Sequence, residues 1–156
     1  MKGLLKITGI FMIACFLLPL SFSYAADINT LVDQFKQATD LQRQQILKDN
    51  FASDISASGI VSNVEEYNYF KEKTDTLKKY YRISTQTQNT PQDTPYEVVF
   101  LYKNESEVKD IPKGERLEAA GKIIKIVDER LQITVWIFSG ELTEQEKDLF
   151  KQDLSL

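Results

Sequence analysis

The chain has 156 residues, of which 42% are hydrophobic and 27% charged, a length and balance typical of one globular domain and not of a disordered chain. It contains no histidine and one cysteine, Cys15, which excludes Ser-His and Cys-His nucleophile pairs and histidine-ligated metals. The formal net charge of −4 disfavours a phosphate backbone as the default partner, because such binding depends on basic side chains.

Residues 1–26 have the pattern of a cleaved signal peptide. Lys2 and Lys6 give a positive start, an apolar run over 7–19 follows, and small residues in 23–25 stand where a signal peptidase reads. Removal of the leader takes away both lysines and leaves 17 basic against 23 acidic side chains, a net charge of −6. We therefore expect export to the periplasm or cell envelope, with no membrane span after cleavage.

Two alternatives to cleavage stay open. One is an uncleaved membrane anchor, although the apolar run is short for a spanning helix of about 20 residues. The other is lipidation of Cys15, because residues 12–15 form a loose version of a lipoprotein processing site. The apolar run continues past Cys15, which favours the signal peptide.

Residues 27–52 are predicted to form a helical segment in two pieces that packs on the domain. Asn29 or Thr30 can cap the first piece, and Thr39 with Gln42 forms a capping box that starts the second. The apolar edge of the second piece is expected to consist of Leu41, Ile46 and Leu47. The alternative function for this segment is a partner-binding helix.

Alternating and β-forming residues predict three strands in the next part of the chain, over 54–68, 80–88 and 96–104. Gly59, inside the first of them, indicates a bulge or a sharp bend. The polar segment 69–79 and the proline-containing segment 89–95 are predicted loops.

Residues 113–138 are predicted to form a β-hairpin around which the domain is organised. Its first strand covers 116–127, a turn follows at 128–129, and its second strand covers 131–138. One face of the first strand is expected to carry Leu117, Ala119, Gly121 and Ile123. In the second strand, Leu131, Ile133, Val135 and Ile137 alternate with Gln132, Thr134, Trp136 and Phe138.

The five predicted strands occur as three, a break, and then two. A short acidic segment at 105–111 fills the break, and Thr143 with Glu146 forms the capping box of a last helix over 143–156. This order is that of the OB fold, a five-stranded Greek-key barrel. We therefore predict a mainly β protein, with a barrel over 53–142, an N-terminal helical segment and a C-terminal helix.

The sequence also resembles a known group of proteins. SGIVSNV at 58–64, KGERLEAAGKIIKIVD at 113–128 and LQITVWIF at 131–138 resemble the exported OB-fold proteins of the tRNA-anticodon-binding-like group. The matching positions are Gly59, Val61, Lys113, Gly114, Gly121 and Ile123. They are structural positions of the barrel, so the resemblance implies a fold and export but no activity.

OB folds use the face of their second and third strands for ligands. The candidate ligand-binding residues there are Tyr69, Tyr81, Arg82, Ser84, Gln86, Tyr102 and Lys103. Aromatic rings and cations of this kind can stack on and pair with a base or a sugar. The alternative is that the aromatic rings fill the core. Trp136 and Phe138 are either covered by a helix or form a patch for a partner.

The carboxylate pairs have no spacing that suggests a calcium loop or a catalytic dyad, so we expect no metal, cofactor or enzymatic activity. These pairs are Glu65 with Glu66, Glu105 with Glu107, and Asp128 with Glu129. The predicted function is an exported, non-enzymatic binding module for an envelope protein, a glycan or a small ligand. The alternative is binding of single-stranded nucleic acid, which a steep fall of affinity with salt would distinguish.

Overall fold

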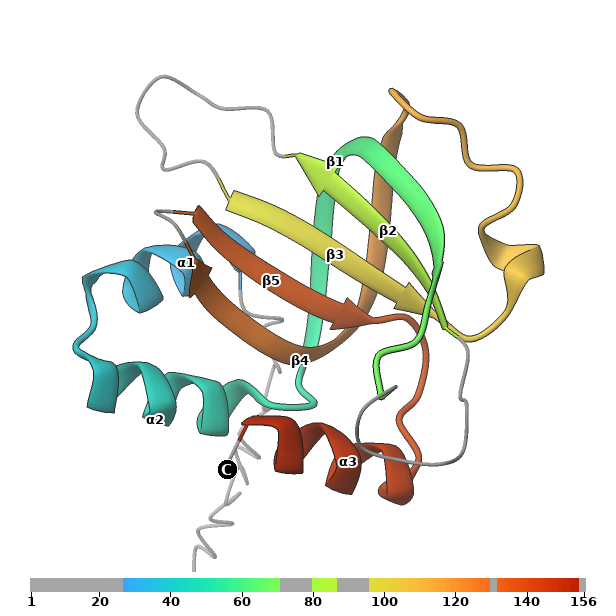
Figure 1. Cartoon of the computed structure of the whole chain (residues 1–156). Helices are drawn as coiled ribbons and strands as arrows, with labels where there is room; N and C mark the ends of the chain where they lie inside the picture. Colours follow the sequence, from blue (N-terminus) through green and yellow to red (C-terminus); the bar gives the residue numbers. More distant parts are fainter. Residues whose placement is uncertain (1–26, 71–79, 87–95, 130–131, 155–156) are drawn as a thin grey trace, which may run out of the picture.

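The computed structural model describes residues 27–70, 80–86, 96–129 and 132–154 (Figure 1). The predicted signal peptide, Cys15 and most of the two predicted loops lie outside the described residues. Within the described part, no helix has the length and apolar character needed to cross a membrane.

Five strands form the body of the protein, and helices precede and follow them. The chain order is α1 (Ile28–Gln37), α2 (Asp40–Asn50), β1 (Asp54–Tyr67), β2 (Tyr80–Gln86), β3 (Tyr96–Tyr102), the 3-10 helix η1 (Glu105–Glu107), β4 (Arg116–Glu129), β5 (Gln132–Phe138) and α3 (Glu144–Leu154). The predicted helices and strands are all present. The main differences are that β4 continues through the expected turn at Asp128 and that β3 ends at Tyr102, two residues before its predicted end. The predicted first residue of β5, Leu131, lies outside the described residues.

The strands close into a barrel in the order β1-β2-β3-β5-β4. All pairs are antiparallel except β3 with β5, which is parallel. The long strand β1 pairs with β4 over Asp54 to Ile60 and with β2 over Ile60 to Tyr67, so it belongs to both sides of the barrel. This topology is the OB fold, which confirms the predicted fold class.

The bulge of β1 does not lie at Gly59, one of the two possibilities expected there. The register of β1 shifts between Val61 and Asn63 instead. Gly59 is required for a different reason. A Cβ atom at this position would press against the side chain of Thr85, which is buried and donates a hydrogen bond to the carbonyl of Val98 (3.0 Å). Glycine therefore lets β1 and β2 approach closely.

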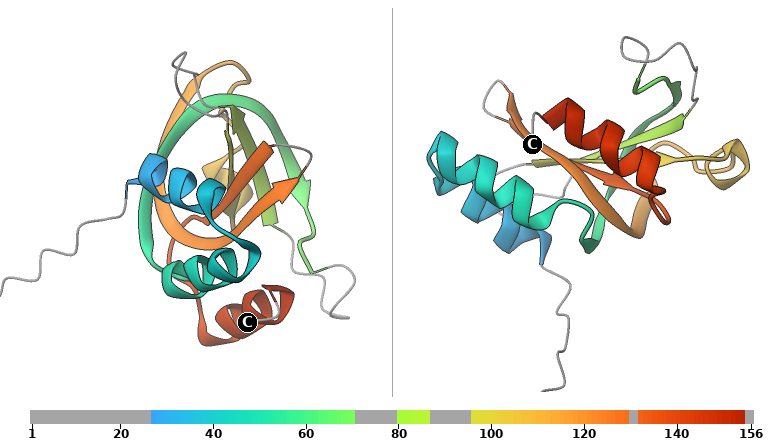
Figure 2. Two further views of the ribbon diagram at one scale, coloured as in Figure 1. Left: turned by 90° about the vertical axis from the view of Figure 1, so that its left-hand side faces the viewer. Right: turned by 90° about the horizontal axis from the view of Figure 1, so that it is seen from below.

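The barrel interior holds the main hydrophobic core, and both of its ends are closed. Inward-pointing residues of all five strands meet there, as the alternation of strand side chains requires. Four buried side chains of α1 cover one end (Figure 2), and Val108, after η1, is buried in the same core at the other end. In α2, Ile46 and Leu47 pack against this core, but Leu41 is 78% exposed, so its predicted place on the apolar edge was wrong.

A second hydrophobic cluster lies on the outside of the barrel, under α3. Its buried members are Phe70, Tyr80, Leu101, Ile124, Phe138, Leu142 and Phe150. Consecutive residues of β4 divide between the two clusters, because Ile123 points into the barrel core and Ile124 points outward into this cluster. Helix α3 therefore covers the part of the outer sheet surface that carries this cluster (Figure 1).

Candidate ligand-binding face

The seven predicted ligand-binding residues lie in three different surroundings. Arg82, Ser84 and Gln86 follow one another on the outer face of β2. Tyr81 and Tyr102 belong instead to the barrel core, where burial raises the pKa of Tyr102. The last two, Tyr69 and Lys103, lie beside α3. The structure thus brings Arg82, Ser84 and Gln86 to one surface and separates Tyr81 and Tyr102 from it.

Three aromatic rings extend this outer surface and contact one another. We call Tyr67, Tyr69 and Trp136 the aromatic ridge. The ring centroids of Tyr67 and Trp136 are 5.8 Å apart, those of Tyr69 and Trp136 are 5.6 Å apart, and those of Tyr67 and Tyr69 are 6.2 Å apart. All three side chains are half-buried: they pack against the outer hydrophobic cluster and keep part of their surface exposed.

The elements of the barrel explain why the ridge forms. Tyr67 is the last residue of β1 and pairs with Tyr80, while Trp136 lies in β5 beside Val99 of β3. Tyr69 is held from the other side, because its hydroxyl donates a hydrogen bond to Asp153 of α3 (2.7 Å). Burial, together with this carboxylate, raises the pKa of Tyr69, which therefore stays a neutral donor.

Arg82 completes the ridge. Its guanidinium carbon lies 4.5 Å from the ring centroid of Tyr67, a cation–π geometry, and its terminal nitrogen is ion-paired with Glu65 of the neighbouring strand. Glu65 and Arg82 are cross-strand partners, so both side chains stand on the same face. The cation is thus fixed between an aromatic ring and a carboxylate.

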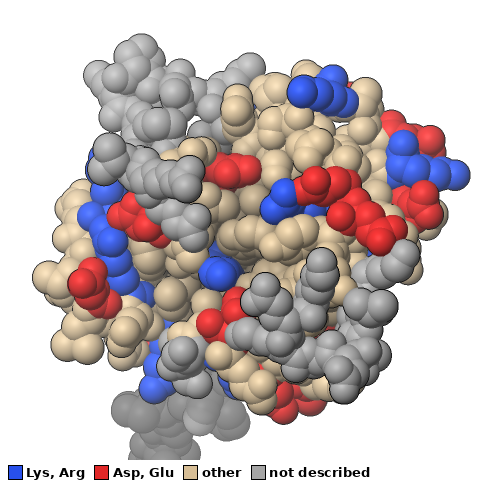
Figure 3. Space-filling model, in the orientation of Figure 1, with Lys and Arg blue, Asp and Glu red and all other residues tan. Residues whose placement is uncertain are grey.

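The other basic side chains near the ridge also have acidic partners. Lys125 lies 3.4 Å from Asp153, and Lys103 lies 3.0 Å from Glu146. On the face seen in Figure 3, described Lys and Arg residues are interspersed with Asp and Glu and form no continuous basic stripe. Among the described residues, the cations beside the ridge are therefore paired with carboxylates, unlike those of the basic grooves that hold nucleic acid backbones.

Glu146 holds α3 beside the ridge through several polar contacts. The carboxylate is 4% exposed, accepts hydrogen bonds from the amide of Thr143 (2.9 Å) and from Lys103 (3.0 Å), and lies 3.4 Å from the hydroxyl of Tyr80. Desolvation acts to raise the pKa of Glu146, but the bonds from Thr143 and Lys103 outweigh it, so the pKa is lowered. The predicted capping box is confirmed, and its buried carboxylate also forms an ion pair with Lys103, whose side chain is exposed.

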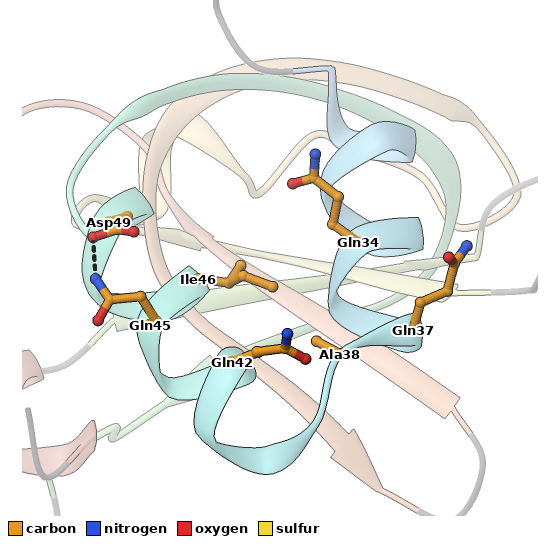
Figure 4. Close-up of a pocket in the computed structure, with 7 residues that line it drawn as sticks. All are labelled: Gln34, Gln37, Ala38, Gln42, Gln45, Ile46 and Asp49. Carbon is orange, nitrogen blue, oxygen red and sulfur yellow. Dashed lines mark hydrogen bonds between the residues drawn. The ribbon is translucent and has the colours of Figure 1, made fainter.

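A hollow lies between α1 and α2 (Figure 4), with a volume of about 420 Å³. It is lined by Gln34, Gln37, Ala38, Gln42, Gln45, Ile46 and Asp49. Two of these amides are already engaged, since Gln42 belongs to the capping box with Thr39 and Gln45 donates to Asp49 (2.6 Å). The hollow offers neither an aromatic ring nor a cation, so the outer face of the barrel is the better candidate.

Among the described residues, no group of three or more His, Cys, Asp or Glu side chains could hold a metal ion. Sequence reasoning missed the role of Glu65, which it considered only as one of the carboxylate pairs, and did not include Tyr67 among the candidate ligand-binding residues. The cross-strand register of β1 and β2 was the missing information, because it decides which acid faces Arg82.

No protein-family model and no curated protein matches the chain. Among solved structures, it is similar to a proposed nucleic acid-binding lipoprotein of Klebsiella pneumoniae, at 15% identity and a TM-score of 0.45, over 67% of this chain and 83% of that one. It is also similar to a mitochondrial single-stranded DNA binding protein of S. cerevisiae, at 13% identity and a TM-score of 0.35, over 55% and 87%. Both likenesses are too distant to transfer a function, and the fold assignment rests on the strand order.

Proposed function

We propose that this protein is an exported, non-enzymatic OB-fold binding module that recognises a protein, a glycan or a small ligand of the cell envelope at the aromatic ridge. The observation that carries the proposal is the ridge itself, in which the half-buried rings of Tyr67 and Trp136 lie on the outer side of the barrel beside Arg82. Aromatic side chains with one accessible edge are typical of binding surfaces, because they offer large contact area at low entropic cost.

Export and family belong to the same proposal. The signal-peptide pattern of residues 1–26 supports export, and the sequence motifs support membership of the tRNA-anticodon-binding-like group of exported OB-fold proteins. The absence of histidine and the single cysteine at position 15 support a binding role without catalysis. Fractionation of the native host, with mass determination of the mature chain, tests cleavage before Asp27 against lipidation of Cys15.

Intrinsic fluorescence is a sharp test of the site, because Trp136 is the one tryptophan in the chain. A ligand of the ridge is expected to change Trp136 emission saturably, and Tyr67→Ala is expected to weaken its binding by at least 10-fold. Leu41→Ala is the matched control, since it removes an exposed apolar side chain from α2, away from the barrel face. A ligand whose affinity is the same in Tyr67→Ala as in the unmodified protein would contradict the proposed site.

Binding of single-stranded nucleic acid is the second candidate. The stacking of Arg82 on Tyr67 favours it, because ring and guanidinium platforms of this kind hold unpaired bases. Titration of the mature chain with labelled oligothymidine at low and high salt decides between the two candidates. Nucleic acid binding requires an affinity that falls steeply with salt, whereas an uncharged ligand gives an affinity that does not change.

A further inference from the structure

We infer that the ligand of the aromatic ridge is an uncharged carbohydrate chain, and that Glu65 is the specificity residue that excludes anionic ligands. The inference rests on the proposed function, since it names the ligand class of the same face. Three features of this face favour such a ligand: its described cations are paired with carboxylates, polar side chains lie next to Trp136, and aromatic rings are partly exposed.

Among the described residues, the cation nearest the ridge, Arg82, is already paired with a carboxylate. Arg82 is ion-paired with Glu65 and stacked on Tyr67 at 4.5 Å, and the side chains of Arg82 and Glu65 are 27% and 37% exposed. A phosphate approaching Arg82 must either displace the Glu65 carboxylate or come to rest beside it. Like charges in contact disfavour the second arrangement by several-fold in affinity, so the pair acts against anions.

The polar groups next to the ridge suit hydroxyl groups instead. The strand register places Ser84, Val99 and Trp136 in one row across β2, β3 and β5, and Gln86, Glu97 and Thr134 in the next row. Within the part of the chain that the structure describes, the side chains of Gln86, Glu97 and Thr134 take part in no hydrogen bond. An amide, a carboxylate and a hydroxyl in the row next to that of Trp136 can therefore form hydrogen bonds with a ligand.

This combination matches the chemistry of a sugar chain. A sugar ring has an apolar face of C–H groups, which packs on Tyr67 and Trp136, and a rim of hydroxyls that donate and accept hydrogen bonds. Amide, carboxylate and hydroxyl side chains satisfy such a rim in both directions, and Glu97 can accept from two hydroxyls at once. Recognition of a sugar chain in this way needs no unpaired Lys or Arg side chain, whereas binding of a phosphodiester chain requires several of them.

The test uses the mature full-length protein and the fluorescence of Trp136. The probes are neutral oligosaccharides, cellohexaose and the hexamer of N-acetylglucosamine, and an oligothymidine of similar length. We expect at least one oligosaccharide to bind saturably, with an affinity that does not change between low and high salt. Tyr67→Ala should weaken this binding by at least 10-fold, while oligothymidine should bind the unmodified protein only weakly.

Glu65→Gln is the decisive variant, because it frees Arg82 without changing the shape of the site. We expect it to bind oligothymidine roughly 10-fold more tightly than the unmodified protein, with a salt slope steeper by about 0.7, as one added phosphate contact gives on a single strand. Glu118→Gln is the matched control. It makes the same charge change on another strand of the barrel, but Glu118 is opposite Ser58 and not Arg82, so no gain is expected.

Two results overturn the inference. One is salt-dependent binding of oligothymidine by the unmodified protein with no gain in Glu65→Gln, which would mean that the ion pair excludes nothing. The other is the failure of both oligosaccharides to bind. The first result, if it depends on Tyr67, would leave the proposed binding face intact. A ligand that leaves Trp136 emission unchanged and ignores Tyr67→Ala would instead overturn the proposed function.

Discussion

Replacing Phe150 with alanine is expected to lower the free energy of unfolding by about 3 kcal/mol. Phe150 is the 0%-exposed anchor of α3, and its ring centroid lies 4.9 Å from that of Phe70, 5.0 Å from Tyr69 and 5.9 Å from Phe138. Truncation of a buried phenylalanine costs about 3–5 kcal/mol in general, part of it from aromatic pairs worth about 0.5–1.5 kcal/mol each. The low end applies because α3 lies at the surface and can shift to close the cavity.

Urea unfolding followed by Trp136 fluorescence and by far-UV circular dichroism measures this effect. Trp136 reports on the cluster because Tyr69 contacts both Trp136 (5.6 Å) and Phe150 (5.0 Å). Phe150→Leu is the control, since it keeps most of the volume and should cost about 1 kcal/mol. A smaller urea dependence in Phe150→Ala would indicate that α3 leaves the barrel before global unfolding.

The reasoning would be refuted by a Phe150→Ala variant within 1 kcal/mol of the unmodified protein and with an unchanged urea dependence. That result would mean that the outer cluster contributes little and that α3 is held by its polar contacts. Because the cluster includes Tyr69, it would also remove the argument that packing under α3 positions the aromatic ridge.

Three further outcomes follow from the packing. Gly121→Ala should destabilise the protein by about 3 kcal/mol in urea unfolding, because the new Cβ would press on the backbone carbonyl of Phe138, which cannot swing aside. Since the pKa of Glu146 is lowered from its ordinary value of 4.5, the Glu146 carboxylate stabilises the folded state above pH 4.5, and this contribution is lost as the pH falls below 4.5. In thermal unfolding across this range, Glu146→Gln should therefore show the weaker pH dependence. Leu41→Gln should change stability by less than about 0.5 kcal/mol, whereas Ile46→Ala, which opens the packing of the same helix, should cost about 1–2 kcal/mol.

A specific result would contradict each of these three predictions. A stable Gly121→Ala protein would show that β4 and β5 can separate locally, and Ala120→Ser, on the exposed neighbouring residue, controls for the strand itself. Identical pH profiles for Glu146→Gln and the unmodified protein would mean that other carboxyl groups govern acid unfolding. A large loss in Leu41→Gln would require a contact that buries this exposed side chain.

Local sequence pattern was sufficient for the elements and their order. Alternation in 131–138 placed Ile133, Val135 and Ile137 on the barrel side of β5, because successive strand residues point to opposite faces. The two capping boxes were also readable, since each depends on residues only three positions apart. The three-then-two order of the strands then predicted the barrel.

The tertiary structure decided what pattern could not. Simple alternation would send Ile126 outward with Ile124, but the register shift after Ile123 turns Ile126 into the core. The partners of charged residues were equally hidden, because Glu65 faces Arg82, and Glu146 faces Lys103, only once the strands and α3 have taken their places. The sequence by itself determined which segments become strands and helices, since these depend on neighbours along the chain. The pairing of Arg82 with Glu65 and of Tyr69 with Asp153 joins residues 17 and 84 positions apart, which only the closed barrel and the helix packed on it bring together.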